Sequence, residues 1–409
     1  MHGATLLDET GSVLRPAILW NDGRSADQCG ALETALPTLG RITGNRAMPG
    51  FTAPKLLWVR EHEPDIFAKI AKVLLPKDYI RLCMTGDYAS DMSDSAGTLW
   101  LDVKARSWST DVLKACGLTE AHMPTLNEGS EITGHLSSDV AREWGMSQVP
   151  VAAGGGDNAA GAVGSGVIRK GEGFLSLGTS GVIFLADDAY RPDADGGLHT
   201  FCHALPGKWH QMAVMLSAAS AVDWVALVTG YDNPAALYSD AATRGSLTDS
   251  EVFLPYLSGE RTPYNDPNAK GVFFGLTHNT DRTAMAQAAL EGVAFGLADG
   301  VNALRKAGAG IDVLSVIGGG ARSHYWGRIL AAAMDVPLTY RESGTVGPAY
   351  GAARLAMIAV TNADVETVCQ PPPISHVIEP DPDLREQLAG KYETYKTLYT
   401  GLSAAFQPA

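Results

Sequence analysis

The clearest pattern of apolar and polar positions lies in residues 173–185, GFLSLGTSGVIFL. Apolar residues alternate with small or polar ones up to Leu177, a glycine-rich stretch interrupts, and a second apolar run follows. Alternation with a period of two is typical of a strand, and turn residues between two such runs predict a hairpin. We therefore expect two antiparallel strands joined at Gly178-Thr179-Ser180-Gly181.

Two other segments join an apolar run, glycines and a helical pattern. Residues 150–167, PVAAGGGDNAAGAVGSGV, predict a strand, a tight turn and a helix that starts near Asp157. Residues 312–335, DVLSVIGGGARSHYWGRILAAAMD, predict the same succession. Further helices are expected at 25–33, 55–61, 217–229 and 282–308, a strand, turn and strand at 1–20, a turn-rich segment at 255–271, and an exposed helix in the tail 371–409.

The length and composition indicate a folded protein of two domains. A chain of 409 residues exceeds the usual size of one core, and 45% apolar with 19% charged residues is globular composition. The composition shifts near Arg169-Lys170-Gly171, so we expect one domain in residues 1–169 and a second in residues 170–409.

Charge and cysteine content exclude several classes of function. A formal net charge of −14 argues against a nucleic-acid partner, which needs a concentrated cationic face. The five cysteines are scattered without a CxxC pair, so neither a disulfide framework nor a structural zinc site is expected. No signal-like start and no membrane-length apolar run occur in the sequence, which predicts a cytoplasmic protein without a membrane partner.

The glycine clusters are suited to phosphate chemistry. Glycine lets backbone amides approach an anion, and the hairpin turn 178–181 and the 318–323 segment both have this character. Asp157 adds a carboxylate that can take a proton from a hydroxyl, and Asn158 beside it can orient a polyol. Together these are parts that phosphoryl transfer requires, with a metal ion supplying further positive charge.

Simpler interpretations exist for each member of this set. A single glycine loop is more often a tight turn than a ligand site, and Asp157 taken alone is better explained as a helix N-cap. The sequence contains no GxxxxGK[ST] loop and no GxGxxG fingerprint with a suitably placed acid. Phosphate chemistry would therefore need another architecture.

Many separated motifs occur in a fixed order along the chain: MHG (1–3), ILWNDGR (18–24), PGFTAPKLLW (49–58), LPKDYIRLCMTG (75–86), SDMSDSAGTLWLDV (90–103), GGGDNAAGAVG (154–164), LSLGTSGV (175–182), FLPYLSGERTPYNDPNAKGVFFGLT (253–277) and IGGGARS (317–323). These motifs resemble those of the FGGY carbohydrate kinases and, within that family, the bacterial xylulokinases. The resemblance covers the chain almost end to end. It implies an α/β fold of two actin-like, ribonuclease H-like ATPase domains, with sugar deep in the cleft between them and ATP mainly on the second domain.

The resemblance also implies residue roles. Asp157 falls on the catalytic base, Thr179 lies near the γ-phosphate with Gly178 and Ser180 in the same loop, and Met1 and His2 fall where sugar is held. Trp20, Asp22 and Asn158 are further candidates for the sugar wall. Gly319, Gly320 and His324 are the candidates for the adenosine end of ATP, and no metal ligand is assigned.

The implied reaction moves the γ-phosphate of ATP, as its Mg2+ complex, to the terminal hydroxyl of a ketopentose, with D-xylulose giving D-xylulose 5-phosphate. Ribulose, gluconate or glycerol kinases of the same family, and a noncatalytic protein that binds sugar or nucleotide, are the alternatives, together with an actin-like assembling or chaperone ATPase. A homodimer is compatible with the resemblance. The DxGTSxxK strand and turn that open family members are not found, so we expect several tens of residues of the first domain to be absent ahead of Met1 and activity to be reduced.

Overall fold

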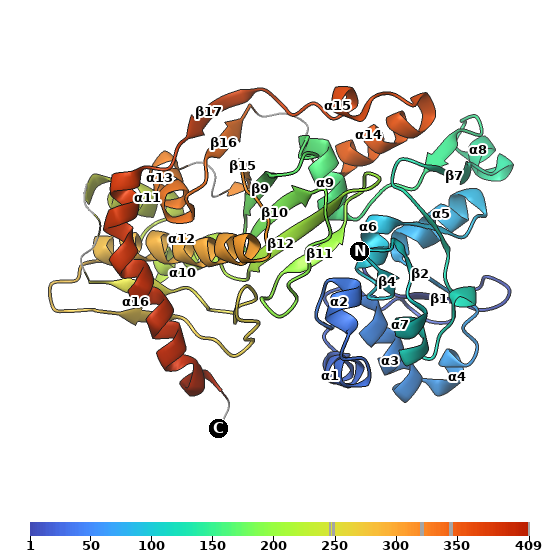
Figure 1. Cartoon of the computed structure of the whole chain (residues 1–409), viewed down its shortest axis with the longest axis horizontal. Helices are drawn as coiled ribbons and strands as arrows, with labels where there is room; N and C mark the ends of the chain where they lie inside the picture. The colour runs from blue at the N-terminus through green and yellow to red at the C-terminus, as the bar shows by residue number, and fades with distance from the viewer. Residues whose placement is uncertain (245–246, 248–249, 320–322, 343–346, 408–409) are drawn as a thin grey trace.

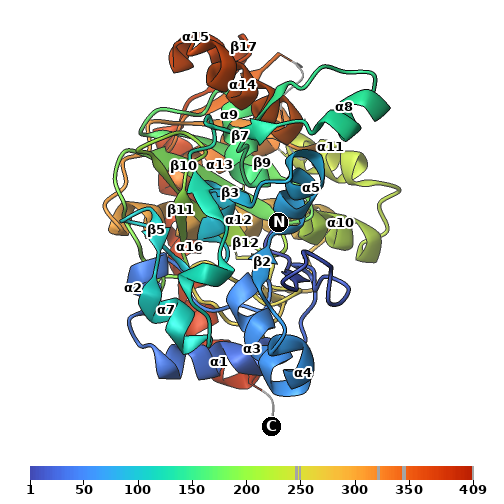
Figure 2. The same cartoon turned by 90° about the vertical axis from the view of Figure 1, so that its right-hand side faces the viewer.

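The computed structural model describes residues 1–409 except 245–246, 248–249, 320–322, 343–346 and 408–409. Two lobes are evident in Figure 1. The N-terminal lobe is built mostly from short helices, and the C-terminal lobe is built on one large sheet. The helices α9 (Asp157–Ser165) and α14 (Pro348–Thr361) lie in the upper part of the molecule where the lobes meet, in Figure 1 and in the turned view of Figure 2.

The C-terminal lobe is organised by a seven-stranded mixed sheet in the order β11-β12-β10-β9-β15-β16-β17. Its strands are β9 (Glu172–Leu177), β10 (Gly181–Asp187), β11 (His199–Cys202), β12 (Trp209–Met215), β15 (Val313–Ile317), β16 (Leu338–Arg341) and β17 (Ile374–Ile378). β15 runs parallel to β9 and β16, and the other neighbours are antiparallel. The predicted hairpin is confirmed, because Leu177 of β9 pairs with Gly181 of β10.

The alternation that predicted the hairpin divides its side chains between two cores. Leu175 and Ile183 face a core formed with the helices α10 (Ala219–Val228), α12 (Arg282–Lys306) and α13 (His324–Met334). Phe174 and Phe184 instead stack on each other in the core shared with the N-terminal lobe. The helices of this lobe are α10 (Ala219–Val228), α11 (Pro234–Arg244), α12 (Arg282–Lys306), α13 (His324–Met334), α14 (Pro348–Thr361), α15 (Val365–Val368) and α16 (Pro382–Phe406), and a small sheet joins β13 (Val252–Leu254) to β14 (Val272–Phe274).

The N-terminal lobe has short helices and, in the described residues, only two-stranded sheets. The sheets pair β1 (Thr5–Leu7) with β2 (Lys72–Leu74), β3 (Ala89–Asp91) with β6 (Thr125–Asn127), β4 (Leu101–Asp102) with β5 (Ser107–Trp108), and β7 (Ile132–His135) with β8 (Pro150–Ala152). The helices are α1 (Ala26–Ala35), α2 (Leu39–Thr43), α3 (Thr52–His62), α4 (Pro64–Phe67), α5 (Pro76–Thr85), α6 (Met92–Ala96), α7 (Thr110–Ala115), a 3-10 turn at Glu120–His122, α8 (Ser138–Glu143) and α9 (Asp157–Ser165).

The predicted helices are confirmed with small changes in their ends. The expected helix at 55–61 begins earlier, at Thr52, because Pro54 fits the first turn where a missing amide costs nothing. In the opening segment the second expected strand is only two isolated bridges, Leu7 with Val13 and Ala4 with Ile18. The tail holds the predicted helix α16 and also β17, which no pattern had indicated.

Candidate active site

Asp157 is the first residue of α9 and lies exposed at its N-terminus. Its Oδ1 accepts hydrogen bonds from the backbone amide of Asn158 at 2.8 Å and from the Asn158 side chain at 3.2 Å. The N-cap is Gly156, which has no side chain to cap with, so the interpretation of Asp157 as a plain N-cap is wrong. Its carboxylate is free to face solvent or a ligand.

The start of α9 is fixed to α6 of the N-terminal lobe. The amide of Gly156 donates a hydrogen bond of 2.9 Å to Ser93 Oγ. A Cβ at Gly156 would stand 3.6 Å from the Cα of Asp94, which is ordinary contact, so a methyl group there would fill the space between the two backbones. Ser93 and Asp94 are themselves held by Asp91, the N-cap of α6, whose carboxylate accepts from both of their amides.

Asp94 faces His2, the residue expected to hold sugar. The two atoms His2 Nδ1 and Asp94 Oδ1 are 3.1 Å apart; the His2 side chain is 24% exposed and that of Asp94 is fully buried. The distance is within reach of a hydrogen bond, but the contact does not meet the geometry of one, and neither atom has a hydrogen-bond partner among the described residues. A small rotation of the ring would align the contact as a hydrogen bond from the ring to the carboxylate.

The conformation of His2 is set by its neighbours. Its φ is 55°, a left-handed value that is uncommon outside glycine, and Thr52 Oγ1 donates a hydrogen bond of 3.0 Å to its carbonyl. The ring lies over Gly97, where a Cβ would come within 2.0 Å of His2 Cε1. It also lies parallel to Phe201 of β11 with centroids 6.2 Å apart. Met1 is half-buried beside it.

Lys77 at the start of α5 supplies the positive charge behind this pair. Its ammonium is 2.6 Å from Asp78 Oδ1, 2.6 Å from Asp91 Oδ2 and 3.7 Å from Asp94 Oδ2. Burial disfavours the charged forms; the mutual attraction outweighs it for Lys77 and Asp94, whereas burial raises the pKa of Asp78. The pKa of Lys77 is raised, and that of Asp94 is lowered to about 2 by Lys77 and His2 despite burial. Asp94 is therefore a buried carboxylate that remains ionised.

Three further histidines are buried in the aromatic cluster that includes Phe201, the neighbour of the His2 ring. His199, His203 and His210 belong to β11, β12 and the turn between them, and their rings cluster with Phe184 and Phe201. Burial lowers the pKa of His199 to about 3 and that of His203 to about 4, and it lowers the pKa of His210 well below its usual value. These rings are neutral parts of the core.

Trp20 and Asp22, the other residues expected in the sugar wall, are not joined to this network by any described contact. Trp20 is 63% exposed. Asp22 makes a bidentate ion pair with Arg24 at 2.7 to 3.0 Å, and hydrogen bonds from Arg24 lower the pKa of its carboxyl. The backbone of Trp20 lies close to Gly50, where a Cβ would stand 3.2 Å from the Trp20 carbonyl oxygen.

The expected phosphate loop lies at the end of the β9–β10 hairpin. The Thr179 carbonyl accepts from the Ala218 amide at 3.0 Å and from Ser220 Oγ at 2.8 Å, and Ala219 N donates to the Gly178 carbonyl at 3.0 Å. The loop is thus fastened to the N-terminus of α10, a position that favours anions. The side chain of Thr179 is exposed and that of Ser180 is half-buried.

The glycine segment after β15 lies beside this hairpin. Because β15 is parallel to β9, both strands end at the same edge of the sheet. Gly318, with φ of 96°, approaches Leu177 so closely that a Cβ would come within 2.6 Å of its carbonyl oxygen. Gly319 has open space where a Cβ would stand, and His324 is exposed at the start of α13 with its ring 6.1 Å from that of His376. Gly320 lies outside the described residues.

The structure therefore forms two groups, one around Asp157 and His2 and one around Thr179 and Gly318. No contact that joins the groups is found among the described residues. Openings of about 480, 390 and 500 Å³ occur elsewhere on the protein, and none of the three is lined by Asp157, His2 or Thr179.

Sequence reasoning missed the roles of Lys77, Ser93 and Asp94. All three stand in segments that carry the family resemblance, PKD and SDMSDSAG, so the motifs were visible but their mutual contacts were not.

In the part of the chain that the structure describes, no three His, Cys, Asp or Glu side chains are arranged to hold a metal ion. None of the described helices has the length and apolar character of a membrane span.

Comparison with known proteins gives consistent results across the chain. The N-terminal domain of the FGGY family of carbohydrate kinases matches residues 1–164, and its C-terminal domain matches residues 173–360. The chain is 54% identical over 405 residues to the xylulose kinase of Escherichia coli K12, a match covering 98% of this chain and 83% of that protein. It is 38% identical over 359 residues to the xylulose kinase of Bacillus subtilis, covering 87% and 72%.

Solved structures are similar over the same extent. A crystal structure from Brucella ovis described as a "xyloylose kinase" superposes with a TM-score of 0.94 at 52% identity, covering 99% of this chain and 84% of that one. The xylulose kinase of Rhodospirillum rubrum superposes with a TM-score of 0.90 at 28% identity, covering 99% and 83%.

Proposed function

This chain belongs to the FGGY family of carbohydrate kinases, and we propose that the sugar it phosphorylates is D-xylulose, giving D-xylulose 5-phosphate. Its fold is the two-domain actin-like fold of that family, and it is an ATP-dependent sugar kinase. The choice of D-xylulose is supported by relatives named xylulose kinase that are 54% and 51% identical over 98% of the chain.

One observation carries the assignment of the site. The hydrogen bond from Gly156 N to Ser93 Oγ fixes the start of α9, which bears Asp157, against the turn of α6, which bears the partner of His2. A proton-accepting carboxylate and a sugar-binding residue are thereby held by the same few residues. Positioning of this kind accounts for a large part of rate enhancement in phosphoryl transfer.

In the proposed reaction Asp157 acts as the general base. It takes the proton of the terminal hydroxyl as that oxygen forms its bond to the γ-phosphorus and the bond from phosphorus to the β–γ bridging oxygen breaks, releasing ADP. Met1, His2 and Asn158 hold the sugar, with Trp20 and Asp22 proposed as outer parts of the same wall. Amides and hydroxyls of Gly178, Thr179 and Ser180 face the phosphates.

The remaining ATP contacts are proposed at Gly319, Gly320 and His324. We propose Mg2+ as the divalent ion, which when bound would neutralise charge on the phosphates. Such an ion is held largely by the nucleotide and needs only one or two protein carboxylates, so the lack of a cluster of three among the described residues is compatible with it.

The wider proposals concern organisation and location. We propose a domain division between residues 169 and 170, in the gap between the two family matches that end at 164 and begin at 173. A homodimer in the cytoplasm, without a nucleic-acid partner, is proposed from the family and from the net charge of −14.

A coupled assay of ADP release tests the substrate. The purified chain is offered ATP with D-xylulose, ribulose, gluconate or glycerol in turn, and calorimetry follows the binding of each. D-xylulose is expected to give the highest kcat/KM. A higher value for another acceptor would reassign the sugar, binding without turnover would favour the noncatalytic alternative, and ATP hydrolysis indifferent to every sugar would contradict the kinase site.

A further inference from the structure

We propose that Asp94 is a positioning residue for sugar recognition, whose carboxylate holds the proton of His2 on Nδ1 and leaves Nε2 as a hydrogen-bond acceptor for a sugar hydroxyl. The inference rests on the proposed function in one respect, namely that His2 contacts the sugar. It adds the residue that decides which kind of hydrogen bond His2 can make.

The chemistry of the pair fixes the direction of the bond. A carboxylate can only accept, so the nitrogen that faces Asp94 Oδ1 at 3.1 Å must carry a hydrogen. In a neutral imidazole the other nitrogen is then unprotonated and accepts. A sugar hydroxyl opposite Nε2 would therefore act as the donor.

Asp94 is suited to this role because it is charged, buried and rigid. Its side chain has no exposure, and Lys77 stabilises the carboxylate from the other side at 3.7 Å. The backbone of Asp94 is fixed by the Asp91 cap and its neighbour Ser93 by the bond from Gly156. A residue buried in this way does not touch the sugar and acts through His2.

The conformation of His2 points to the same role. A non-glycine residue in the left-handed region is retained only where its surroundings over-determine it, and such residues gather at functional sites. Gly97 leaves the space for the ring and Phe201 covers it. The Asp94 contact adds the one feature that these apolar neighbours cannot supply, which is the choice of tautomer.

The test is a double-mutant cycle with the nearly isosteric substitution Asp94→Asn and with His2→Gln. Asp94→Asn removes the charge that selects the tautomer, so KM for the sugar is expected to rise about tenfold, with KM for ATP within about threefold of the parent. If Asp94 acts through His2, the double variant should be no worse than His2→Gln alone. Additive losses would overturn the inference.

A matched control separates the contact from the charge cluster. Asp91→Asn removes one negative charge beside the same Lys77 and keeps a good N-cap, but Asp91 does not face His2. Its effect on KM should add to that of His2→Gln. If Asp91→Asn, like Asp94→Asn, added nothing to the KM effect of His2→Gln, the cluster as a whole and not the Asp94 contact would control His2.

A spectroscopic measurement decides the tautomer independently of activity. In protein with 15N-labelled histidine rings, the His2 signals are assigned by their loss in His2→Gln. We expect a protonated Nδ1 and an unprotonated Nε2 in the parent and a changed ratio in Asp94→Asn. Protonation of both nitrogens, or of Nε2 alone, would overturn the inference. If no sugar is turned over, the proposed function fails while this measurement still decides the role of Asp94.

Discussion

The hydroxyl of Ser93 accepts a 2.9 Å hydrogen bond from the amide of Gly156, across 63 residues of sequence. The same hydroxyl donates to Asp91, so one side chain joins the cap of α6 to the start of α9. Through this bond the part of the protein that contacts His2 and the part that carries Asp157 are fixed relative to each other.

Ser93→Ala should therefore lower kcat strongly although it lowers the unfolding free energy only modestly. The change leaves a buried amide without a partner and costs about 1–2 kcal/mol of unfolding free energy. Because Asp157 is then free to shift, kcat should fall about tenfold or more. Denaturant unfolding and steady-state kinetics measure the two effects.

Ser95→Ala is the matched control, since Ser95 lies in the same helix and bonds only to Ser90 at 2.9 Å among the described partners of its hydroxyl. It should reduce stability by a similar amount and leave kcat within about twofold. Equal kcat losses in the two variants would show that general loosening of α6, and not the bond to Gly156, is responsible.

Asp157→Asn tests the proposed base directly. The amide keeps the size of the side chain and can still accept from Asn158, but it cannot take a proton. We expect kcat to fall by about 10²–10⁴ while calorimetry finds sugar affinity within a few fold of the parent. Asp139→Asn, an exposed aspartate on α8, should change neither. Turnover in Asp157→Asn equal to the parent would reject the role.

Gly97→Ala should disturb His2 alone. The backbone at Gly97 has φ of −78° and ψ of 0°, which alanine tolerates, but the new methyl would come within 2.0 Å of the His2 ring. The ring must move, so KM for the sugar should rise about tenfold, and overpacking should cost about 1–3 kcal/mol. Steady-state kinetics and thermal unfolding test this.

Gly30→Ala provides the comparison for that variant. Gly30 lies in α1, and a Cβ added there would meet no atom within 4 Å, so alanine should stabilise the helix by about 0.5–1 kcal/mol without changing KM. An unchanged KM in Gly97→Ala would contradict the position of the His2 ring.

The buried histidines predict a loss of stability in mild acid. The folded-state pKa values of His199 and His203 are about 3 and about 4, below the usual 6.5. Below pH 6.5 the unfolded chain binds protons that the folded chain rejects, so the unfolding free energy falls as pH decreases towards 4. The slope is at most about 1.4 kcal/mol per pH unit for each histidine.

Buried carboxyls change the unfolding free energy with pH in the direction opposite to that of the histidines. Burial raises the pKa of Glu260 to about 8 and that of Asp299 to about 6. Their contribution to the unfolding free energy is therefore largest in acid and is lost as pH rises through those values. His210→Phe should isolate the histidine effect by flattening the decline of the unfolding free energy below pH 6.5. Chemical denaturation between about pH 4.5 and 7.5 measures the unfolding free energy as a function of pH. If its slope against pH were unchanged in His210→Phe, the neutral buried state of His210 would be contradicted.

The sequence predicted what depends on local pattern. The hairpin at 178–181 and the position of Asp157 at a helix start follow from alternation and glycine spacing within a few residues. The approach of Asp94 to His2 could not be predicted from pattern, because it joins residues on separate elements through the fold. Strand β17 was missed because ISHVI is mostly exposed and owes its form to pairing with β16.

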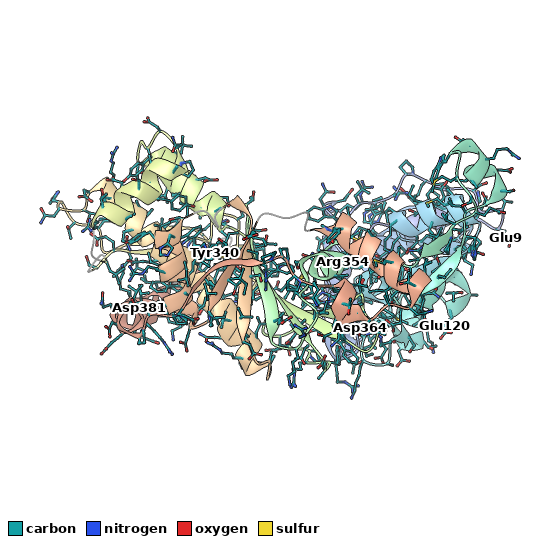
Figure 3. The ribbon with its side chains drawn as sticks, turned by 90° about the horizontal axis from the view of Figure 1, so that it is seen from above. Glu9, Glu120, Tyr340, Arg354, Asp364 and Asp381 are labelled. Carbon is teal, nitrogen blue, oxygen red and sulfur yellow. The ribbon has the colours of Figure 1, made fainter. Side chains whose placement is uncertain are left out.

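Arg354 of α14 lies on the side of the N-terminal lobe, away from Tyr340 (Figure 3). Its guanidinium donates to the carbonyls of Val163 and Gly164 at 2.9 Å and to that of Gln370 at 2.5 Å. The first two carbonyls lie at the C-terminal end of α9, where a cation also opposes the helix dipole. Arg354 therefore holds one end of the helix whose other end carries Asp157.

Arg354→Lys should cost about 2–4 kcal/mol of unfolding free energy, because one ammonium cannot reproduce a planar fork that reaches three carbonyls. The fall in kcat should stay below that of Ser93→Ala, since the N-terminal end of α9 keeps its own bond to Ser93. Arg385→Lys, at an exposed ion pair with Asp335, should cost less than about 1 kcal/mol. If Arg354→Lys lowered kcat more than Ser93→Ala while sparing stability, the position of Asp157 would depend on the C-terminal end of α9 and not on the Ser93 bond.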